Sequence, residues 1–275
     1  MPQPTFPPTP SPTPQHTAPL TPEVSVVVPV RNEQDNIRPL VEEIHAALEG
    51  VAEFEVIYVD DGSDDATPIR LVETMATHPR LRVLRHRTCC GQSTALVSAI
   101  RAARGQYIAT LDGDGQNDPA DIPALLVVAR TEGGPTPLLV AGWRAQRNDT
   151  WFRRFSSIVA NAIRARLLKD HTPDTGCGLK VFPRETFLTL PYFDHMHRFL
   201  PALFLRTGGR VQSVPVHHRP RTCGISKYGL HNRLWVGMVD LLGVRWLQAR
   251  AKIPQVEPLQ TFPGIGIGID CSSDP

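Results

Sequence analysis

The chain has 275 residues, a formal net charge of +2 and a hydrophobic content of 41%, which is enough to bury the core of one large domain. The near-neutral charge argues against a general nucleic-acid binder. Five cysteines without a C-x-x-C pair fit no disulfide framework and indicate a reduced, cytosolic compartment. No run of about twenty apolar residues is present, so the sequence predicts no transmembrane helix.

The chain begins with a proline-rich segment. Residues 1–22 hold nine prolines and no charged residue, a composition typical of disordered, partly polyproline-II tails. We expect a folded domain over residues 23–216, followed at 217–254 by a loop and an amphipathic helix. Residues 255–275 contain glycines at alternate positions from Gly264 to Gly268 but match no phosphate-binding loop, and they stay unassigned.

Strands and helices are predicted to alternate through the first half of the folded domain. The expected strands are Val24–Pro29, Phe54–Val59, Leu81–Leu84, Tyr107–Leu111 and Leu138–Ala141. The expected helices are Asn36–Leu48, Ala66–Ala76, Gly91–Arg104 with Gly105 at its C-cap, and Ile122–Arg130. This alternation predicts an α/β fold with a mostly parallel sheet flanked by helices, and such sheets bind ligands beyond the carboxyl ends of their strands.

The most informative segment is Asp112-Gly113-Asp114-Gly115-Gln116, directly after a short apolar run. Alternate residues of an extended segment point the same way, so Asp112, Asp114 and Gln116 are predicted to converge. Two carboxylates and an amide oxygen are hard ligands that suit Mg²⁺ or Mn²⁺ with positions left for phosphate oxygens. The alternative is an Asp/Gly-rich turn with solvated carboxylates.

Two further polar clusters fall at predicted strand ends: Arg31-Asn32-Glu33 and Asp60-Asp61. The first stands where a dinucleotide-binding domain would carry G-x-G-x-x-G, which argues against that class. A metal held by carboxylates can neutralise a diphosphate instead, and Asp61 can accept hydrogen bonds from a base or a ribose. Three clusters at one sheet edge therefore predict a ligand site.

These motifs resemble a known family. Pro29-x-x-Asn32-Glu33, Val59-Asp60-Asp61-Gly62-Ser63 and Asp112 to Gln116 are similar to signatures of inverting glycosyltransferases with the Rossmann-like GT-A fold, in the dolichol-phosphate mannosyltransferase and polyprenyl-phosphate glycosyltransferase branch. The resemblance covers about residues 23–252 and implies donor contacts at Pro29, Arg31, Glu33, Asp61, Asp112 and Gly113. It implies metal ligands at Asp112, Asp114 and Gln116. Cys89 departs from the family, where asparagine is usual.

The second half carries the residues that the resemblance implies for a phosphate-bearing acceptor. Arg144, Arg153 and Ser157 match positions that grip a lipid phosphate, which suits guanidinium groups. The segment from Arg219 to Tyr228 resembles an R-x-x-G-x-S-K loop, with Arg221, Ser226 and Lys227 in reach of phosphate oxygens and Arg219 beside them. A basic surface helix and an ordinary basic turn are the respective alternatives.

Asp174, in Asp174-Thr175-Gly176, resembles the family's D-x-[ST]-G loop near the sugar, as a catalytic or orienting group. A phosphate monoester with a second pKa near about 6 is largely dianionic at neutral pH, so we expect Asp174 to position the acceptor. The spacing of His195, His197, His217 and His218 suits no common zinc site, and the segment from His197 to Pro201 is expected to cap a helix near the donor sugar.

Residues 231–252 mix tryptophans and leucines with cations, which predicts a helix lying in a lipid interface or, alternatively, one packed on the sheet. The hypothesis is a metal-dependent inverting enzyme that moves a hexose, mannose as first choice, from a nucleotide sugar such as GDP-mannose to a polyprenyl phosphate at the cytoplasmic membrane face. A separate membrane partner is left open. The rivals are a same-fold enzyme that uses a UDP-sugar and a saccharide acceptor, and a non-catalytic binding module.

Overall fold

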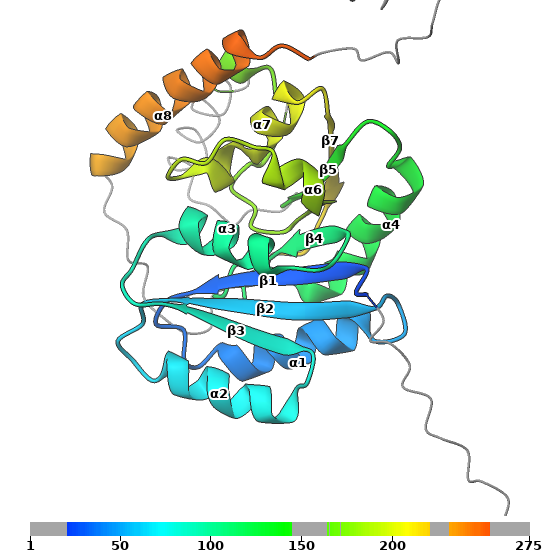
Figure 1. Ribbon diagram of the computed structural model, residues 1–275, viewed down its shortest axis with the longest axis vertical. Coiled ribbons are helices and arrows are strands. Elements are labelled where there is room, and N and C mark those ends of the chain that lie inside the picture. The colour runs from blue at the N-terminus through cyan, green and yellow to red at the C-terminus, as the bar shows by residue number, and fades with distance from the viewer. Residues whose placement is uncertain (1–20, 145–163, 165, 171, 221–230, 254–275) are drawn as a thin grey trace, which may run out of the picture.

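The structure is a computed structural model that describes residues 21–144, 164, 166–170, 172–220 and 231–253 (Figure 1). Its strands are β1 Val24–Val30, β2 Phe54–Asp61, β3 Leu81–His86, β4 Tyr107–Thr110, β5 Leu138–Trp143, β6 Lys180–Pro183 and β7 Arg210–Pro215. Its α-helices are α1 Ile37–Leu48, α2 Thr67–Thr77, α3 Gln92–Ala102, α4 Ile122–Glu132, α6 Arg184–Leu188, α7 Leu200–Arg206 and α8 His231–Arg250. Short 3₁₀ turns lie at Pro119–Asp121 and Met196–Phe199.

The strands form one seven-stranded sheet in the order β3-β2-β1-β4-β6-β5-β7. β1 pairs in parallel with β2 and β4, and β2 pairs in parallel with β3. β6 runs antiparallel between β4 and β5, and β7 is parallel to β5. The carboxyl ends of β1, β2, β3 and β4 therefore meet at one edge, which confirms the predicted mostly parallel α/β fold.

Helices cover both faces of the sheet (Figure 1). On one face, α1 and α4 bury a core that includes Ile37, Ile44 and Leu125. On the other face, α3, α7 and α8 pack around Ile100, Phe204, Val244 and their neighbours. The β-branched residues of β1 and β2 are buried on both faces, as expected for central parallel strands.

Most predicted elements are confirmed within a few residues. The helix expected over Asn36–Leu48 is α1, and its buried residues recur at helical spacing as one apolar stripe: Ile37, Leu40, Val41, Ile44 and Leu48. Gly105 is an exception, because α3 ends at Ala102 with Ala103 as its C-cap, so its predicted role as helix cap is wrong. The Gly105 N–H instead donates to Ser25 Oγ at 2.9 Å. This glycine serves the contact between the end of α3 and β1.

Helix α8 confirms the predicted C-terminal helical appendage and lies outside α7 (Figure 1). Its inner side is attached by polar contacts: Asp240 pairs with His195 at 3.1 Å, and Gln248 donates to the carbonyls of Leu168 and Ala202. Among the described residues no helix is long and apolar enough to cross a bilayer. Residues 1–20, which are most of the predicted N-terminal tail, and residues 254–275 lie outside the described part of the chain.

Candidate active site

At the end of β2 the two adjacent aspartates have different environments. Asp60 is buried, accepts the Ser63 N–H at 2.9 Å and pairs with Arg85 at 3.0 Å. Asp61 is also buried but faces the loop between β3 and α3. Asp60 thus stabilises its own strand end, while Asp61 is the member of the pair that belongs to the site.

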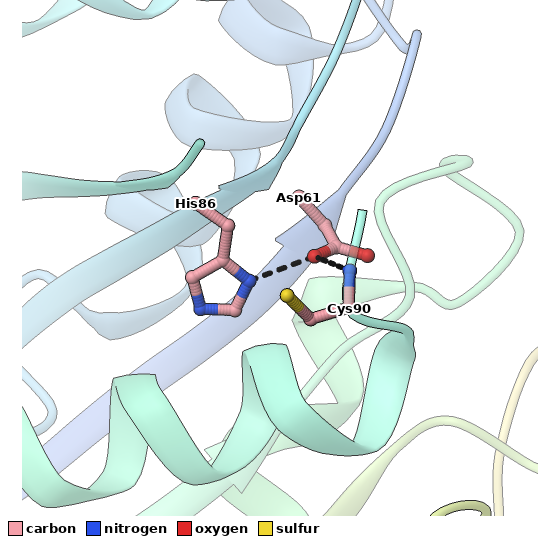
Figure 2. Close-up of side chains that lie close together, drawn as sticks. All are labelled: Asp61, His86 and Cys90. Carbon is pink, nitrogen blue, oxygen red and sulfur yellow. Dashed lines mark hydrogen bonds and ion pairs between the residues drawn. The ribbon is translucent and has the colours of Figure 1, made fainter. Parts of the chain in front are cut away.

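The Asp61 carboxylate is held from several sides (Figure 2). One oxygen accepts hydrogen bonds from His86 Nδ1 at 2.7 Å and the Cys90 N–H at 2.8 Å, and the other from the Gly91 N–H at 2.8 Å and Cys89 Sγ at 3.1 Å. Burial acts to raise the pKa of Asp61, but these bonds outweigh it and hold the pKa below its usual value. Asp61 is therefore an oriented carboxylate anion.

The first predicted cluster forms the loop after β1, next to Asp61. Pro29 lies within β1, opposite Val59 of β2. Arg31 donates to Cys89 Sγ at 3.0 Å, and the Glu33 side chain accepts from Asn36 at 2.7 Å. The structure thus brings Pro29, Arg31 and Glu33 to the same sheet edge as Asp61.

The acidic motif follows β4 at the neighbouring strand end. Gln92, the first residue of α3, donates to Asp112 Oδ1 at 2.9 Å, and the Gln116 N–H donates to Asp114 Oδ1 at 3.1 Å. Burial, and after it the negative charge of Asp114, raise the pKa of Asp112. The two carboxylates therefore act on each other electrostatically, and the backbone N–H of Gln116 holds one Asp114 oxygen.

Two glycines allow the backbone to approach this motif closely. A Cβ on Gly178 would lie 2.2 Å from Asp112 Oδ2, and one on Gly113 would lie 2.4 Å from Val30 Cγ1. Neither distance is sterically allowed, so the positions of both the Asp112 carboxylate and the 113 backbone depend on glycine. Gly113 was predicted as a donor contact, whereas Gly178 carried no sequence signal beyond its place near Asp174.

The donor set of the acidic motif fits Mg²⁺ or Mn²⁺. Its ligand atoms are carboxylate oxygens, which these hard cations prefer. Burial first, and the negative charge of Asp114 second, raise the pKa of Asp112, and a divalent cation bound by the two carboxylates would offset both effects. Asp112 and Asp114, with Gln116 beside them, are the residues that would hold the metal.

At the same carboxyl edge of the sheet, two strands along from β4, two predicted site residues pair with each other. Arg144, just after β5, forms a bidentate ion pair with Asp174, from Nε to Oδ2 at 2.7 Å and from Nη2 to Oδ1 at 2.9 Å. The Asp174 side chain is 5% exposed and that of Arg144 is 15% exposed. Both oxygens of Asp174 are engaged by the guanidinium, so the carboxylate fixes the orientation of Arg144.

A cavity of about 330 Å³ lies between Asp112 and the segment that follows Asp174. It is lined by Gln92, Leu96, Thr110, Leu111, Asp112, Thr175, Gly176, Cys177, Gly178, Lys180, His197, Arg198 and Leu200. Lys180, from β6, is buried and donates to the Cys177 carbonyl; burial lowers its pKa, against the attraction of Asp112 and Asp174. Lys180 and Gln92 are site residues that the sequence analysis missed.

His197 lines the same cavity. The segment from His197 to Pro201 leads into α7, with Phe199 as the N-cap residue and Pro201 in the first turn, and the cap has no side-chain hydrogen bond. His197 Nδ1 hydrogen-bonds Ser93 Oγ at 2.8 Å. Burial, followed by the charges of Arg198 and Lys180, lowers the pKa of His197 to about 3, so the ring is neutral near pH 7.

Residues 25–190 of the chain match the protein family described as "Glycosyl transferase family 2". That range is more than half of the chain and contains all three predicted strand-end clusters and the Arg144–Asp174 pair. The chain belongs to glycosyl transferase family 2.

A curated relative supports this assignment over a longer range. The dodecaprenyl-phosphate galacturonate synthase of Rhizobium johnstonii is 36% identical over 252 residues, which cover 90% of this chain and 72% of that protein. The resemblance predicted from the three motifs is thereby confirmed at the level of the glycosyltransferase family.

Solved structures of glycosyltransferases share the fold. The mannosyltransferase PcManGT of Pyrobaculum calidifontis, in complex with GDP-Man and Mn²⁺, is 24% identical with a TM-score of 0.58, covering 85% of this chain and 66% of its own. Glucosyl-3-phosphoglycerate synthase of Mycobacterium tuberculosis, with Mn²⁺, UDP and its product, is 21% identical with a TM-score of 0.59, covering 85% and 81%. These similarities confirm the GT-A architecture.

The predicted acceptor site of this family 2 protein includes two segments after β5 and β7. Arg153, Ser157, Arg221, Ser226 and Lys227 lie outside the described residues. Arg219, expected beside them, is described and pairs with Glu43 at 2.7 Å and with Asp118 at 2.6 Å. Its guanidinium therefore links the segment after β7 to α1 and the acidic loop rather than standing free for a phosphate.

Proposed function

We propose that this family 2 glycosyltransferase moves a sugar from a nucleotide sugar to a polyprenyl phosphate, with inversion at the anomeric carbon. The observation that carries the proposal is the 36% identity over 90% of this chain to a dodecaprenyl-phosphate galacturonate synthase. The paired strand-end sites around Asp61 and Asp112 support it, because they offer one oriented carboxylate and one cation-binding pair at a single sheet edge.

On the donor side, Asp61 and the loop with Arg31 and Glu33 would hold the nucleoside. Asp112 and Asp114 would hold Mg²⁺ or Mn²⁺, which supplies positive charge for the departing diphosphate. Gln92 orients Asp112 through its 2.9 Å hydrogen bond. The cavity between Asp112 and Lys180 is in position for the sugar.

On the acceptor side, the phosphate oxygen itself is the nucleophile. A phosphate monoester is largely dianionic at neutral pH, so the reaction needs no general base. Asp174 then fixes the orientation of Arg144 through two hydrogen bonds, and the remaining N–H groups of the guanidinium can face a phosphate. Attack opposite the leaving diphosphate inverts the anomeric centre.

For the transferred sugar we propose a hexuronic acid in preference to mannose. The relative's name specifies galacturonate, and the cavity is lined by the cationic residues Lys180 and Arg198. A buried lysine adds attraction for a sugar carboxylate that a neutral hexose does not need. GDP-mannose remains the second donor to test.

We also propose that α8 places the protein on a lipid surface at the cytoplasmic face. Met238, Leu242 and Trp246 follow one another at four-residue intervals and are 53%, 60% and 60% exposed, so they form one apolar stripe. Arg245 and Arg250 are exposed on the same helix. Apolar residues flanked by cations are typical of helices that lie in the headgroup region.

A radiolabelled transfer assay tests the reaction. Purified protein with Mn²⁺ and a short polyprenyl phosphate is incubated in parallel with UDP-galacturonate, GDP-mannose and UDP-glucose. We expect label to enter the organic phase from one donor, UDP-galacturonate, and this transfer to stop on addition of EDTA. Transfer to a saccharide but to no lipid would instead assign the same-fold rival, and nucleotide binding without any transfer would assign a binding module.

Vesicle flotation tests the lipid surface. We expect wild-type protein to float with anionic vesicles, and the double substitution Leu242→Glu with Trp246→Glu to abolish flotation. The matched control is Ile69→Glu with Val72→Glu on α2, two apolar residues that are 61% and 62% exposed on another helix. Equal loss in both double variants would remove α8 from the proposal.

A further inference from the structure

Three side chains of metal-ligand type meet at the end of β2 (Figure 2). Asp61 ends β2, His86 ends β3, and Cys90 lies in the loop before α3. One ligand atom from each lies within 4.8 Å of the other two, and the Cys90 thiol points toward the His86 ring and the carboxylate. Among the described residues, no other three His, Cys, Asp or Glu side chains meet this spacing.

The ligand chemistry differs from that of the acidic motif after β4. A thiolate, an imidazole and a carboxylate together suit Zn²⁺, whereas Mg²⁺ and Mn²⁺ prefer oxygen ligands alone. Ligand atoms around a tetrahedral Zn²⁺ lie about 3.3 to 3.7 Å apart, given metal bonds of about 2.0 to 2.3 Å. His86 Nδ1 and Asp61 Oδ1 are 2.7 Å apart, which is closer than this spacing, and the exposed Cys90 thiol donates to the Thr88 carbonyl at 3.3 Å. Metal binding therefore requires the two hydrogen-bonded ligands to move apart and the Cys90 side chain to turn away from Thr88.

The surroundings of the cluster already orient two of the ligands. His86 Nε2 hydrogen-bonds Ser98 Oγ at 2.9 Å, which leaves Nδ1 directed at Asp61 Oδ1. A zinc-bound histidine typically uses its second ring nitrogen in this way. The Gly91 N–H holds the other Asp61 oxygen at 2.8 Å. On metal binding through Nδ1, the ring proton moves from Nδ1 to Nε2, which then donates to Ser98 Oγ, and the thiol proton of Cys90 is released to solvent.

We propose that Asp61, His86 and Cys90 form a Zn²⁺ site, with a water molecule as the fourth ligand, and that its occupation excludes the nucleotide of the donor. The metal site stands on this geometry alone. Its competition with the nucleotide rests on the proposed function, since Asp61 is there the carboxylate that contacts the nucleoside. Zn²⁺ would then inhibit transfer at a place distinct from the catalytic Mg²⁺ or Mn²⁺.

Cobalt substitution tests the site without any activity measurement. The full-length reduced protein is titrated with Co²⁺, and thiolate-to-cobalt charge-transfer absorption is recorded, which a carboxylate site cannot produce. We expect this absorption in the wild type and its displacement by Zn²⁺. Cys90→Ser and His86→Gln should abolish it, while the matched control Cys89→Ser, the adjacent thiol outside the three-residue cluster, should retain it.

Several outcomes would overturn the assignment. Absence of the charge-transfer absorption in the wild type, its persistence in Cys90→Ser, or its loss in Cys89→Ser alone each contradicts the site. Thermal melts of the variants establish that they fold, and Cys90→Ser changes a single atom, so loss of absorption in a folded variant reports on the ligand.

Competition is measured separately by calorimetric titration of UDP or GDP into protein with and without Zn²⁺. We expect Zn²⁺ to weaken nucleotide binding at least about tenfold in the wild type and not in Cys90→Ser, each compared with its own metal-free affinity. Unchanged nucleotide affinity would overturn the exclusion while leaving the cobalt result intact. Failure of the transfer assay with every donor bears on the proposed function and leaves both titrations interpretable.

Discussion

Two aspartates at neighbouring strand ends, Asp61 after β2 and Asp112 after β4, have opposite electrostatic environments. Both are partly or fully buried at the same sheet edge. Four hydrogen-bond donors surround Asp61 and lower its pKa against burial. Burial and the neighbouring Asp114 raise the pKa of Asp112, with Gln92 as its side-chain donor.

The opposite pKa shifts of Asp61 and Asp112 suit the two aspartates to different functions, although both follow a strand at the same sheet edge. The anion at Asp61 is already stabilised by the chain, so it can present a fixed acceptor to a nucleoside. The anion at Asp112 is under-stabilised by the chain, so a bound cation lowers its energy most. A sheet edge that combines both can recognise the uncharged and the charged ends of one nucleotide sugar.

The sharpest test of this comparison replaces each aspartate by asparagine. Asp112→Asn should reduce transfer at least about 10³-fold, because it removes a metal ligand, while leaving the unfolding midpoint unchanged or higher, since the strained charge is gone. Asp61→Asn should lower stability by about 1 to 3 kcal/mol, because its donors lose a charged acceptor. Equilibrium urea unfolding and the transfer assay measure both; equal stability losses would contradict the comparison.

Gly178→Ala should reduce transfer by about 10²-fold, the scale of a misplaced catalytic geometry, because the new Cβ would lie 2.2 Å from Asp112 Oδ2. Gly134→Ala is the control, since its Cβ would meet nothing within 4 Å. Steady-state kinetics on both variants, with circular dichroism to establish folding, checks this. Full activity in Gly178→Ala would show that the position of Asp112 tolerates displacement.

Lys180→Met tests the cavity between Asp112 and the segment after Asp174. If Lys180 binds a sugar carboxylate, kcat/KM should fall about 10- to 100-fold for UDP-galacturonate and less for a neutral UDP-sugar, in keeping with a charged hydrogen bond of about 1.5 to 3 kcal/mol. The measurement is the ratio of kcat/KM for the two donors. An equal loss for both would assign Lys180 to balancing Asp112 and Asp174 instead.

Asp174→Asn should cost about tenfold in kcat, because Arg144 keeps one neutral partner. The pH profile of kcat should keep its shape, since we expect no proton transfer to Asp174. A much larger loss, together with disappearance of the acidic limb, would make Asp174 a general base. Arg144→Lys, which keeps the charge but not the bidentate geometry, should produce a similar loss.

The smallest expected effect concerns stability and His197. Its pKa of about 3 in the folded protein lies below the value of about 6.5 for an unfolded histidine, so between these values the unfolded state binds an additional proton. Stability should therefore fall as pH drops below about 6.5, by at most about 1.4 kcal/mol per pH unit. His197→Gln should flatten this dependence of stability on pH. An unchanged slope in urea melts from pH 7 to pH 5 would contradict the lowered pKa of His197 as its cause.

Local pattern determined much of this protein. The β-branched run at 24–30 and the apolar stripe of α1 predicted buried elements correctly because strand and helix periodicities follow from backbone geometry. The polar clusters at Arg31, Asp61 and Asp112 were predicted to share one edge because parallel strands align their carboxyl ends. The family resemblance rested on these same residues.

Only the tertiary structure decided which site residues contact each other and in which direction their pKa values shift. Lys180 and Gln92 lie 88 positions apart in the chain yet line one cavity, and no local pattern joins them. The pairing of Arg144 with Asp174, the Asp61–His86–Cys90 cluster and the Gly105–Ser25 contact likewise depend on which segments pack together. Burial and charge sum over neighbours from the whole fold, so the opposite pKa shifts of Asp61 and Asp112 arise only once the sheet is assembled.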